Sequence, residues 1–230
     1  MHHHDTAEDG FVLAARTSEL LRTAGTVTLV TNSRAVPADH FRTLLPRADD
    51  VFIVFNRHRF TLGPDLAPHT VWVHRLDEAS GRFFGESAPD AAFHHLRVAG
   101  AEPRQAALPA DTSYLSYRAP LPDLRAYPVG RRLLVPQHRV RRIVSPSTGF
   151  VVLALLMELQ RRGAGFRLRA VGVGREFDGW PGHAWAFERK RLRDCGIDFR
   201  APDGRAAGCH TAVDRLPYEL VRAASKLKPW

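Results

Sequence analysis

The stretch TVTLVTNS, residues 26–33, decides the fold class of this chain. Such a nearly continuous β-branched and apolar run is typical of a strand that is buried on both faces of a parallel sheet. The runs DVFIVFN at 50–56, HTVWVHRL at 69–76 and FRLRAVGVG at 166–174 have the same character. The sequence therefore predicts a sheet that is mostly parallel.

Helices are predicted between these strands. The clearest is SPSTGFVVLALLMELQRRG, residues 145–163, which has hydroxyl residues to cap its start and arginines in its last turn. We expect further helices at 11–23, within 37–49, at 88–100 and at 183–196. The alternation predicts an α/β fold: a single Rossmann-like domain with a mostly parallel sheet and helices on both faces.

This domain is expected to span residues 11–230. Residues 1–10, which include a run of three histidines, are interpreted as a tail or tag-like segment and are left out of arguments about metals. Residues 101–144 are the least regular part, rich in proline, arginine and tyrosine. Loops of this kind often shape binding sites, so we expect the surface for a second substrate there.

The composition and charge of the chain limit the classes of function that it can have. The chain has 230 residues, of which 44% are hydrophobic, which excludes a disordered protein. A formal charge of +9 favours an anionic partner. Two cysteines without CxxC spacing predict no disulfide framework, and the absence of a membrane-length apolar run or a signal-peptide pattern predicts a cytoplasmic protein. Outside residues 1–10 the histidines show no HxH or HExxH spacing, so no metal site is predicted. We also expect no cofactor.

Polar residues follow several predicted strands at the point where each ends. Asn32 and Ser33 end the first strand, Asn56 and Arg57 follow the second, and the Gly-rich segment 172–174 follows a late strand. The carboxyl ends of parallel strands meet at one edge of the sheet, where ligands bind. Ser147, Thr148 and Gly149 open the helix at the same edge, and its N-terminus attracts a phosphate or carboxylate.

The ordered set of these segments resembles the sialyltransferases of glycosyltransferase family 29. TVTLVTNS with DVFIVFN looks like their first large motif, SPSTGFVVLALLMEL is similar to their second, and HAWAFERKRL matches their His-x4-Glu motif as His183 and Glu188. The resemblance spans residues 26–196, with the stretches between the motifs unmatched. The bacterial sialyltransferases of family 42 share the strands that end in Asn and are a related alternative.

The resemblance implies a GT-A-like sialyltransferase variant of the fold and a metal-independent, inverting transfer of an acidic sugar from a CMP-sugar. The sugar is sialic acid or Kdo, and the acceptor is a glycan or glycolipid. His183 would be the general base and Glu188 would support the helix start. The donor nucleotide would be held by the residues that match the first two motifs: Asn32, Ser33, Asn56, Arg57, Ser147, Thr148 and Gly149.

The remaining expectations follow from the same resemblance. Residues 101–144 would form the acceptor-side loop region. The resemblance also allows peripheral contact of the protein with the inner face of an anionic membrane. The chain departs from the family at Thr31, which replaces a glycine, and at 176–180, where the third motif has no clear match. This departure keeps a non-catalytic nucleotide-binding relative as an alternative. The other alternative is a basic nucleic-acid-binding domain that uses the Arg-rich stretch 125–142. The sequence contains no known nucleic-acid-recognition motif that would support nucleic acid as the partner.

Overall fold

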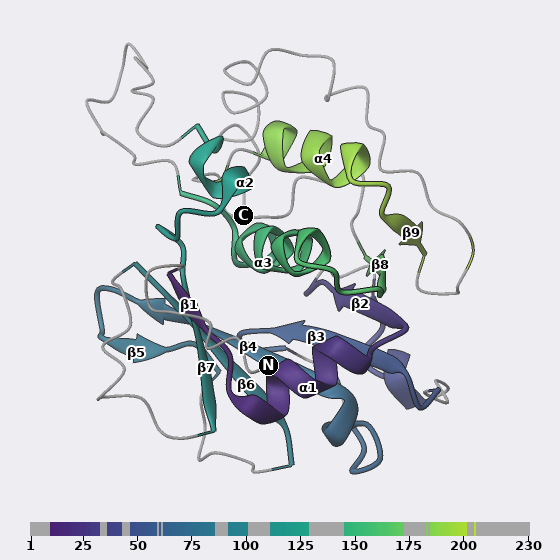
Figure 1. Ribbon diagram of the computed structural model, residues 1–230. Coiled ribbons are helices and arrows are strands. Elements are labelled where there is room, and N and C mark those ends of the chain that lie inside the picture. The colour runs from purple at the N-terminus through teal and green to yellow at the C-terminus, as the bar shows by residue number, and fades with distance from the viewer. Residues whose placement is uncertain are drawn as a thin grey trace.

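Nine strands of the described residues form one mixed sheet (Figure 1). The computed structural model describes residues 10–32, 36–42, 47–58, 60, 62–85, 92–100, 111–128, 145–172, 183, 185–201 and 205. The strands lie in the order β1-β7-β6-β4-β3-β2-β8-β9, and β5 pairs with β4 beside this path. Neighbouring strands are parallel except in the pairs β1–β7 and β4–β5. The strand bounds are β1 Phe11–Val12, β2 Thr26–Val30, β3 Asp50–Phe55, β4 Thr70–Asp77, β5 Arg82–Phe83, β6 His94–Ala99, β7 Thr112–Ser116, β8 Arg167–Val171 and β9 Asp198–Arg200.

Among the described residues the α-helices are fewer than the strands. They are α1 Ala15–Thr23, α2 Pro122–Arg125, α3 Thr148–Arg161 and α4 Trp185–Asp194, with short 3-10 turns η2 His40–Arg42 and η3 Ala67–His69. The strands predicted from the four apolar runs are confirmed as β2, β3, β4 and β8, and the helices predicted at 145–163 and 183–196 are confirmed as α3 and α4. The first predicted helix begins at Ala15 because Phe11–Val12 pairs with β7 as strand β1.

One prediction about local structure is wrong. Residues 94–99, expected to be helical, form β6 between β4 and β7. Leu96 and Val98 of this strand are buried with the two-residue period of a strand, and the alanines that precede β6 do not set its conformation. Within the segment 101–144, residues 112–116 form strand β7 and residues 122–125 form helix α2.

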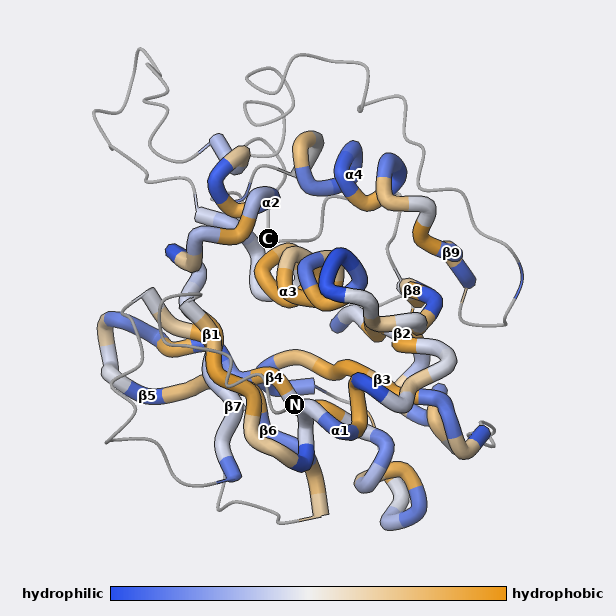
Figure 2. The backbone as a smooth tube through the Cα atoms, in the orientation of Figure 1, coloured by the Kyte–Doolittle hydropathy of each residue, from blue (hydrophilic) through white to orange (hydrophobic). Residues whose placement is uncertain are grey.

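The main hydrophobic cluster lies on one face of the sheet and includes residues from every α-helix of the described part. Its sheet residues are alternate ones such as Val27, Val51 and Ile53, and helix α3 supplies most of its helical side chains. Helix α1 lies on the same face, since the Thr17 hydroxyl is 3.4 Å from Nδ1 of His94. Figure 2 shows the apolar residues along β3 and over much of α3, whereas α4 is largely hydrophilic.

The prediction of helices on both faces is therefore wrong for the residues that the structure describes. The opposite face carries a second cluster, in which Phe52 and Val54 of β3 pack with Phe41, Phe60 and Leu66. These covering residues come from a 3-10 turn and from non-helical segments of the connections between β2, β3 and β4. A few large aromatic and apolar side chains thus cover this face where the prediction placed helices.

The helical layer is fixed around one buried carboxylate. Asp123 of α2 is 1% exposed and accepts hydrogen bonds from Arg161 of α3 and, at 2.7 Å, from Arg191 of α4. A buried charge is tolerated only when it is paired in this way. The contact holds α2, α3 and α4 together above the sheet, with the start of α3 near the carboxyl ends of the strands (Figure 1).

Candidate functional site

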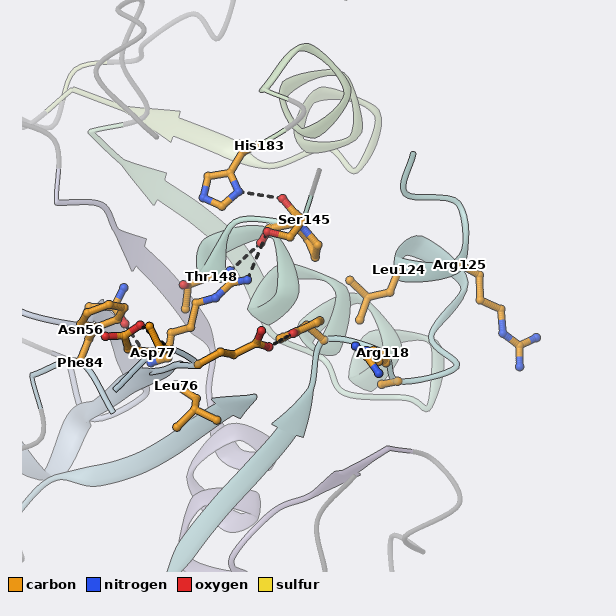
Figure 3. Close-up of a pocket in the computed structure, with 16 residues that line it drawn as sticks. Asn56, Leu76, Asp77, Phe84, Arg118, Leu124, Arg125, Ser145, Thr148 and His183 are labelled. Atoms are coloured by element: carbon orange, nitrogen blue, oxygen red, sulfur yellow. Dashed lines mark hydrogen bonds between the residues drawn. The ribbon is translucent and has the colours of Figure 1, made fainter. Parts of the chain in front are cut away.

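A cavity of about 840 Å³ lies at the carboxyl edge of the parallel strands. Its walls come from the end of β4, from residues that follow β3, β4 and β7, from α2, from the start of α3 and from His183, which precedes α4 (Figure 3). Segments far apart in the sequence therefore meet at the place where sheets of this kind bind ligands. The lining residues include Asn56, Arg75, Asp77, Glu78, Phe84, Tyr117, Ser145, Thr148 and His183.

The start of α3 is capped by its own sequence. Ser147 is the N-cap, and its Oγ accepts the N–H of Phe150 at 3.1 Å. The same hydroxyl lies 2.5 Å from Oε2 of Glu188 and donates to it. Thr148 lines the cavity, and a Cβ placed on Gly149 would make only an ordinary van der Waals contact, with Oγ of Ser147 at 3.9 Å. The side chain of Ser147 thus bonds within the protein, while Thr148 is the residue of the first helical turn that lines the cavity.

Glu188 of α4 stabilises the start of α3 by accepting hydrogen bonds from Ser147. It is 3% exposed, and its Oε1 accepts the N–H of Ser147 at 2.9 Å and the hydroxyl of Tyr127 at 2.8 Å. Burial raises the pKa of this carboxyl, while the hydrogen bonds from Ser147 and Tyr127 and the charge of Arg75 act in the opposite direction. Glu188 thus contacts the N-cap of α3 and Tyr127, which follows α2, and it is not among the residues that line the cavity.

Arg75, at the end of β4, brings a cation into the cavity. Its Nη1 donates to the carbonyl of Pro146 at 2.6 Å, and its guanidinium carbon lies 5.2 Å from the centre of the Tyr117 ring. Burial lowers the pKa of Arg75, but a guanidinium remains charged in proteins, and Tyr117 and Glu188 favour the charged form. An anion in the cavity would therefore meet a fixed positive charge beside the N-terminus of α3.

His183 presents a neutral imidazole to the same cavity. Its Nδ1 lies 2.7 Å from the carbonyl oxygen of Ser145, so this nitrogen carries the proton and Nε2 is the basic nitrogen (Figure 3). Burial lowers the pKa of His183 to about 4, the hydrogen bond to Ser145 opposes this, and Arg75 lowers the pKa further. The ring is thus unprotonated at neutral pH and can accept a proton from a hydroxyl group.

The strand-end asparagines have structural contacts at this edge. Nδ2 of Asn32 donates to the carbonyl of Phe55 at 2.8 Å and ties the end of β2 to that of β3. Asn56 has a positive φ of 49°, lines the cavity, and accepts the N–H of Arg75 on Oδ1 at 2.9 Å. The structure places Arg57 in a neighbouring cavity and not among the residues around His183.

Several sequence expectations fall on residues outside the described part. These are Ser33, the segment 173–182 with EFDGW, the N-terminal residues 1–9, and most of the Arg-rich stretch 125–142. Arg75, Tyr117 and Tyr127 are site residues that the sequence reasoning did not single out. The search for polar residues at strand ends could have identified Arg75, because it lies near the end of the run HTVWVHRL.

The described residues contain no group of three or more His, Cys, Asp or Glu side chains arranged to hold a metal ion. None of the helices in the described part has the length and apolar character needed to cross a membrane. No family model, curated protein or solved structure matches the chain. The chemistry of the cavity itself, a neutral base beside a cation and a helix N-terminus, therefore carries the argument about function.

Proposed function

We propose that this chain transfers an acidic sugar, sialic acid or Kdo, from a CMP-sugar to a hydroxyl of a glycan or glycolipid. The observation that carries the proposal is the neutral imidazole of His183 in one cavity with Arg75 and the start of α3. A base and an anion-binding surface are the two things that such a transfer requires. A GT-A-like sialyltransferase variant of the Rossmann-like fold is part of the proposal.

The proposed step inverts the anomeric carbon. Nε2 of His183 accepts the proton of the acceptor hydroxyl as its oxygen bonds to the anomeric carbon. The bond from that carbon to the phosphate oxygen breaks, and its electron pair leaves with CMP. Arg75 and the N–H groups at the start of α3, next to Thr148 and Gly149, stabilise the charge on the phosphate. No metal or further cofactor takes part in this proposal.

Asn32, Ser33 and Asn56 are the proposed contacts of the nucleotide on the strand side, and Ser147 with Glu188 supports the helix start. We place the reaction in the cytoplasm, with contact to the inner face of an anionic membrane as the route to a glycolipid acceptor. The formal charge of +9 supports both anionic substrates.

The first test is the thermal stability of the protein with CMP, CDP, UDP, GDP and NAD in parallel. A ligand that binds the folded state alone raises the melting temperature, so we expect a shift with the cytidine nucleotides. The second test is hydrolysis of the CMP-sugar by wild type and His183→Gln. A matched control is His69→Gln, because His69 also contacts a backbone carbonyl, that of Asp50, at 3.2 Å but precedes β4 at the opposite edge.

The outcomes separate the alternatives. CMP binding with hydrolysis that falls in His183→Gln alone supports the transferase. CMP binding with no hydrolysis in wild type indicates a non-catalytic nucleotide-binding relative. No shift with CMP, together with steeply salt-dependent binding of unrelated oligonucleotides, indicates a nucleic-acid-binding domain.

A further inference from the structure

A second cavity, of about 760 Å³, lies next to the first. We call it the hairpin cavity, because it is lined by Arg57 and by residues 77 and 80–85 of the hairpin that joins β4 and β5. Asp77 and Phe84 line both cavities, so the hairpin forms a shared wall between them. A molecule bound in the hairpin cavity is therefore adjacent to the cavity that contains His183.

Phe84 stands at this shared wall with its ring exposed. It is 37% exposed and is the one large hydrophobic side chain recorded as exposed in the described part of the chain. Its backbone is fixed on both sides: its N–H donates to the carbonyl of Arg75 at 2.9 Å, and its carbonyl lies 3.1 Å from Nδ1 of His74. An exposed aromatic ring on a fixed backbone is a surface on which a sugar ring can stack at low entropic cost.

The hairpin is also fastened to the end of β3. Gly85 has a positive φ of 75°, and a Cβ at this position would clash with the carbonyl of Asn56 and crowd the N–H of Arg57. Only a glycine permits such close contact between the two segments. This contact keeps Arg57 and Phe84 on the same small surface.

The charge of the hairpin cavity is positive. Arg57 and Arg82 are exposed, and neither has an ion-pair partner among the residues that the structure describes. The single carboxylate of the lining, Asp77, accepts hydrogen bonds from the N–H of Ala79 at 3.2 Å and the hydroxyl of Ser80 at 2.7 Å. Two guanidinium groups beside an aromatic ring match a saccharide that carries a carboxylate.

We propose that the hairpin cavity binds the acceptor, and that this acceptor is an acidic saccharide. One sugar ring stacks on Phe84, its carboxylate pairs with Arg57 and Arg82, and its hydroxyl enters the first cavity toward Nε2 of His183. This inference rests on the proposed function, and it assigns Arg57 to the acceptor and not to the donor nucleotide. The acceptor-side surface thus includes residues 77–85, outside the segment 101–144.

The test measures binding by calorimetry, with tetragalacturonic acid as the acidic probe and maltotetraose as the neutral one. We expect wild type to bind the acidic probe alone. Phe84→Leu keeps apolar bulk but removes the ring and should weaken binding about fivefold, whereas Phe84→Tyr should bind as wild type does. Arg57→Gln with Arg82→Gln should also weaken binding about fivefold and should reduce its salt dependence.

A matched double variant controls for net charge. Arg47→Gln with Arg167→Gln also removes two positive charges. These two exposed arginines lie before β3 and at the start of β8, at the opposite edge of the sheet. Equal weakening by the two double variants, or equal binding of both tetrasaccharides, overturns the inference, and so does wild-type binding by Phe84→Leu. Binding of CMP to the hairpin variants is measured in parallel. If wild type binds the acidic probe as described but neither binds CMP nor hydrolyses a CMP-sugar, the proposed function fails while the saccharide site stands.

Discussion

Acidification should destabilise this protein through His183. The unfolded chain takes up a proton at this histidine near the ordinary pKa of 6.5, whereas the folded chain does so at about 4. A proton therefore binds the unfolded state more tightly. The stability contributed by the neutral ring is complete above pH 6.5 and is lost as the pH falls toward 4.

The size of the effect follows from the shift of the pKa. Since one pKa unit corresponds to about 1.4 kcal/mol, the free energy of unfolding should fall by about 2 kcal/mol between about pH 8 and about pH 5 through His183. The pKa of His94 is also lowered to about 4, mainly by burial, so this histidine adds a loss of similar size, while the raised pKa of Glu188 acts in the opposite direction. The difference between wild type and His183→Gln isolates the part that belongs to His183.

The assay is urea unfolding across this pH range for wild type, His183→Gln and His94→Gln. Each variant should show a shallower pH dependence than wild type by about 2 kcal/mol. Nuclear magnetic resonance of the ring nitrogens gives the pKa of His183 directly. Identical pH dependence in wild type and His183→Gln, or a folded-state pKa near 6.5, would refute the reasoning. For the proposed transferase, the acid limb of kcat/KM should then lie near the lowered pKa.

Three substitutions test the scaffold around the cavities. Gly149→Ala should stabilise the protein by about 0.5–1 kcal/mol, because a Cβ there fits with only a van der Waals contact to Oγ of Ser147 at 3.9 Å, and should weaken CMP binding, as thermal unfolding and calorimetry will report. Gly85→Ala should cost about 1–3 kcal/mol in urea unfolding, because its φ is positive and the Cβ clashes with Asn56. Tyr127→Phe removes a hydroxyl from buried Glu188 and should cost about 1–3 kcal/mol in the same assay.

The sequence predicts the central strands well because their physical signal is local. Val27, Leu29, Val51 and Ile53 lie in continuous apolar runs, and a parallel strand buried on both faces requires such runs. Strand β6 carries a weaker signal, since histidines and an arginine interrupt it. Its conformation depends on pairing with β4 and β7, which no local pattern contains.

For a related reason, the sequence did not predict which residues cover the face of the sheet that carries Phe52 and Val54. Alternation of strands and helices favours helices on both faces, but it does not say how much surface a connection must cover. Phe41 and Phe60 each bury a large ring against β3 and its neighbours without forming an α-helix. The size and position of single aromatic side chains determine how this face of the sheet is covered. The hydrophobic periodicity of the sequence does not predict either of them.

The candidate site is predicted to the extent that it follows from the strand ends. Once the strands are known to be parallel, Asn56 and Thr148 must lie at one edge, and the structure brings both to one cavity. The role of a side chain at that edge depends on its contacts. The hydroxyl of Ser147 is shared between Phe150 and Glu188, and this arrangement requires α4 to pack behind α3.

Segment 145–147 is held by hydrogen bonds from distant parts of the chain. Its carbonyls accept hydrogen bonds from Arg75 and His183, 71 and 38 residues away in the sequence, and Glu188 accepts the N–H of Ser147 from 41 residues away. These contacts fix the backbone that orients both the imidazole of His183 and the first turn of α3. A phosphate that leaves with extra negative charge would then meet dipoles that are already aligned, and no reorganisation would oppose the reaction. The same contacts that hold the helix start therefore connect His183, the proposed base, to the first turn of α3, the proposed anion-binding surface.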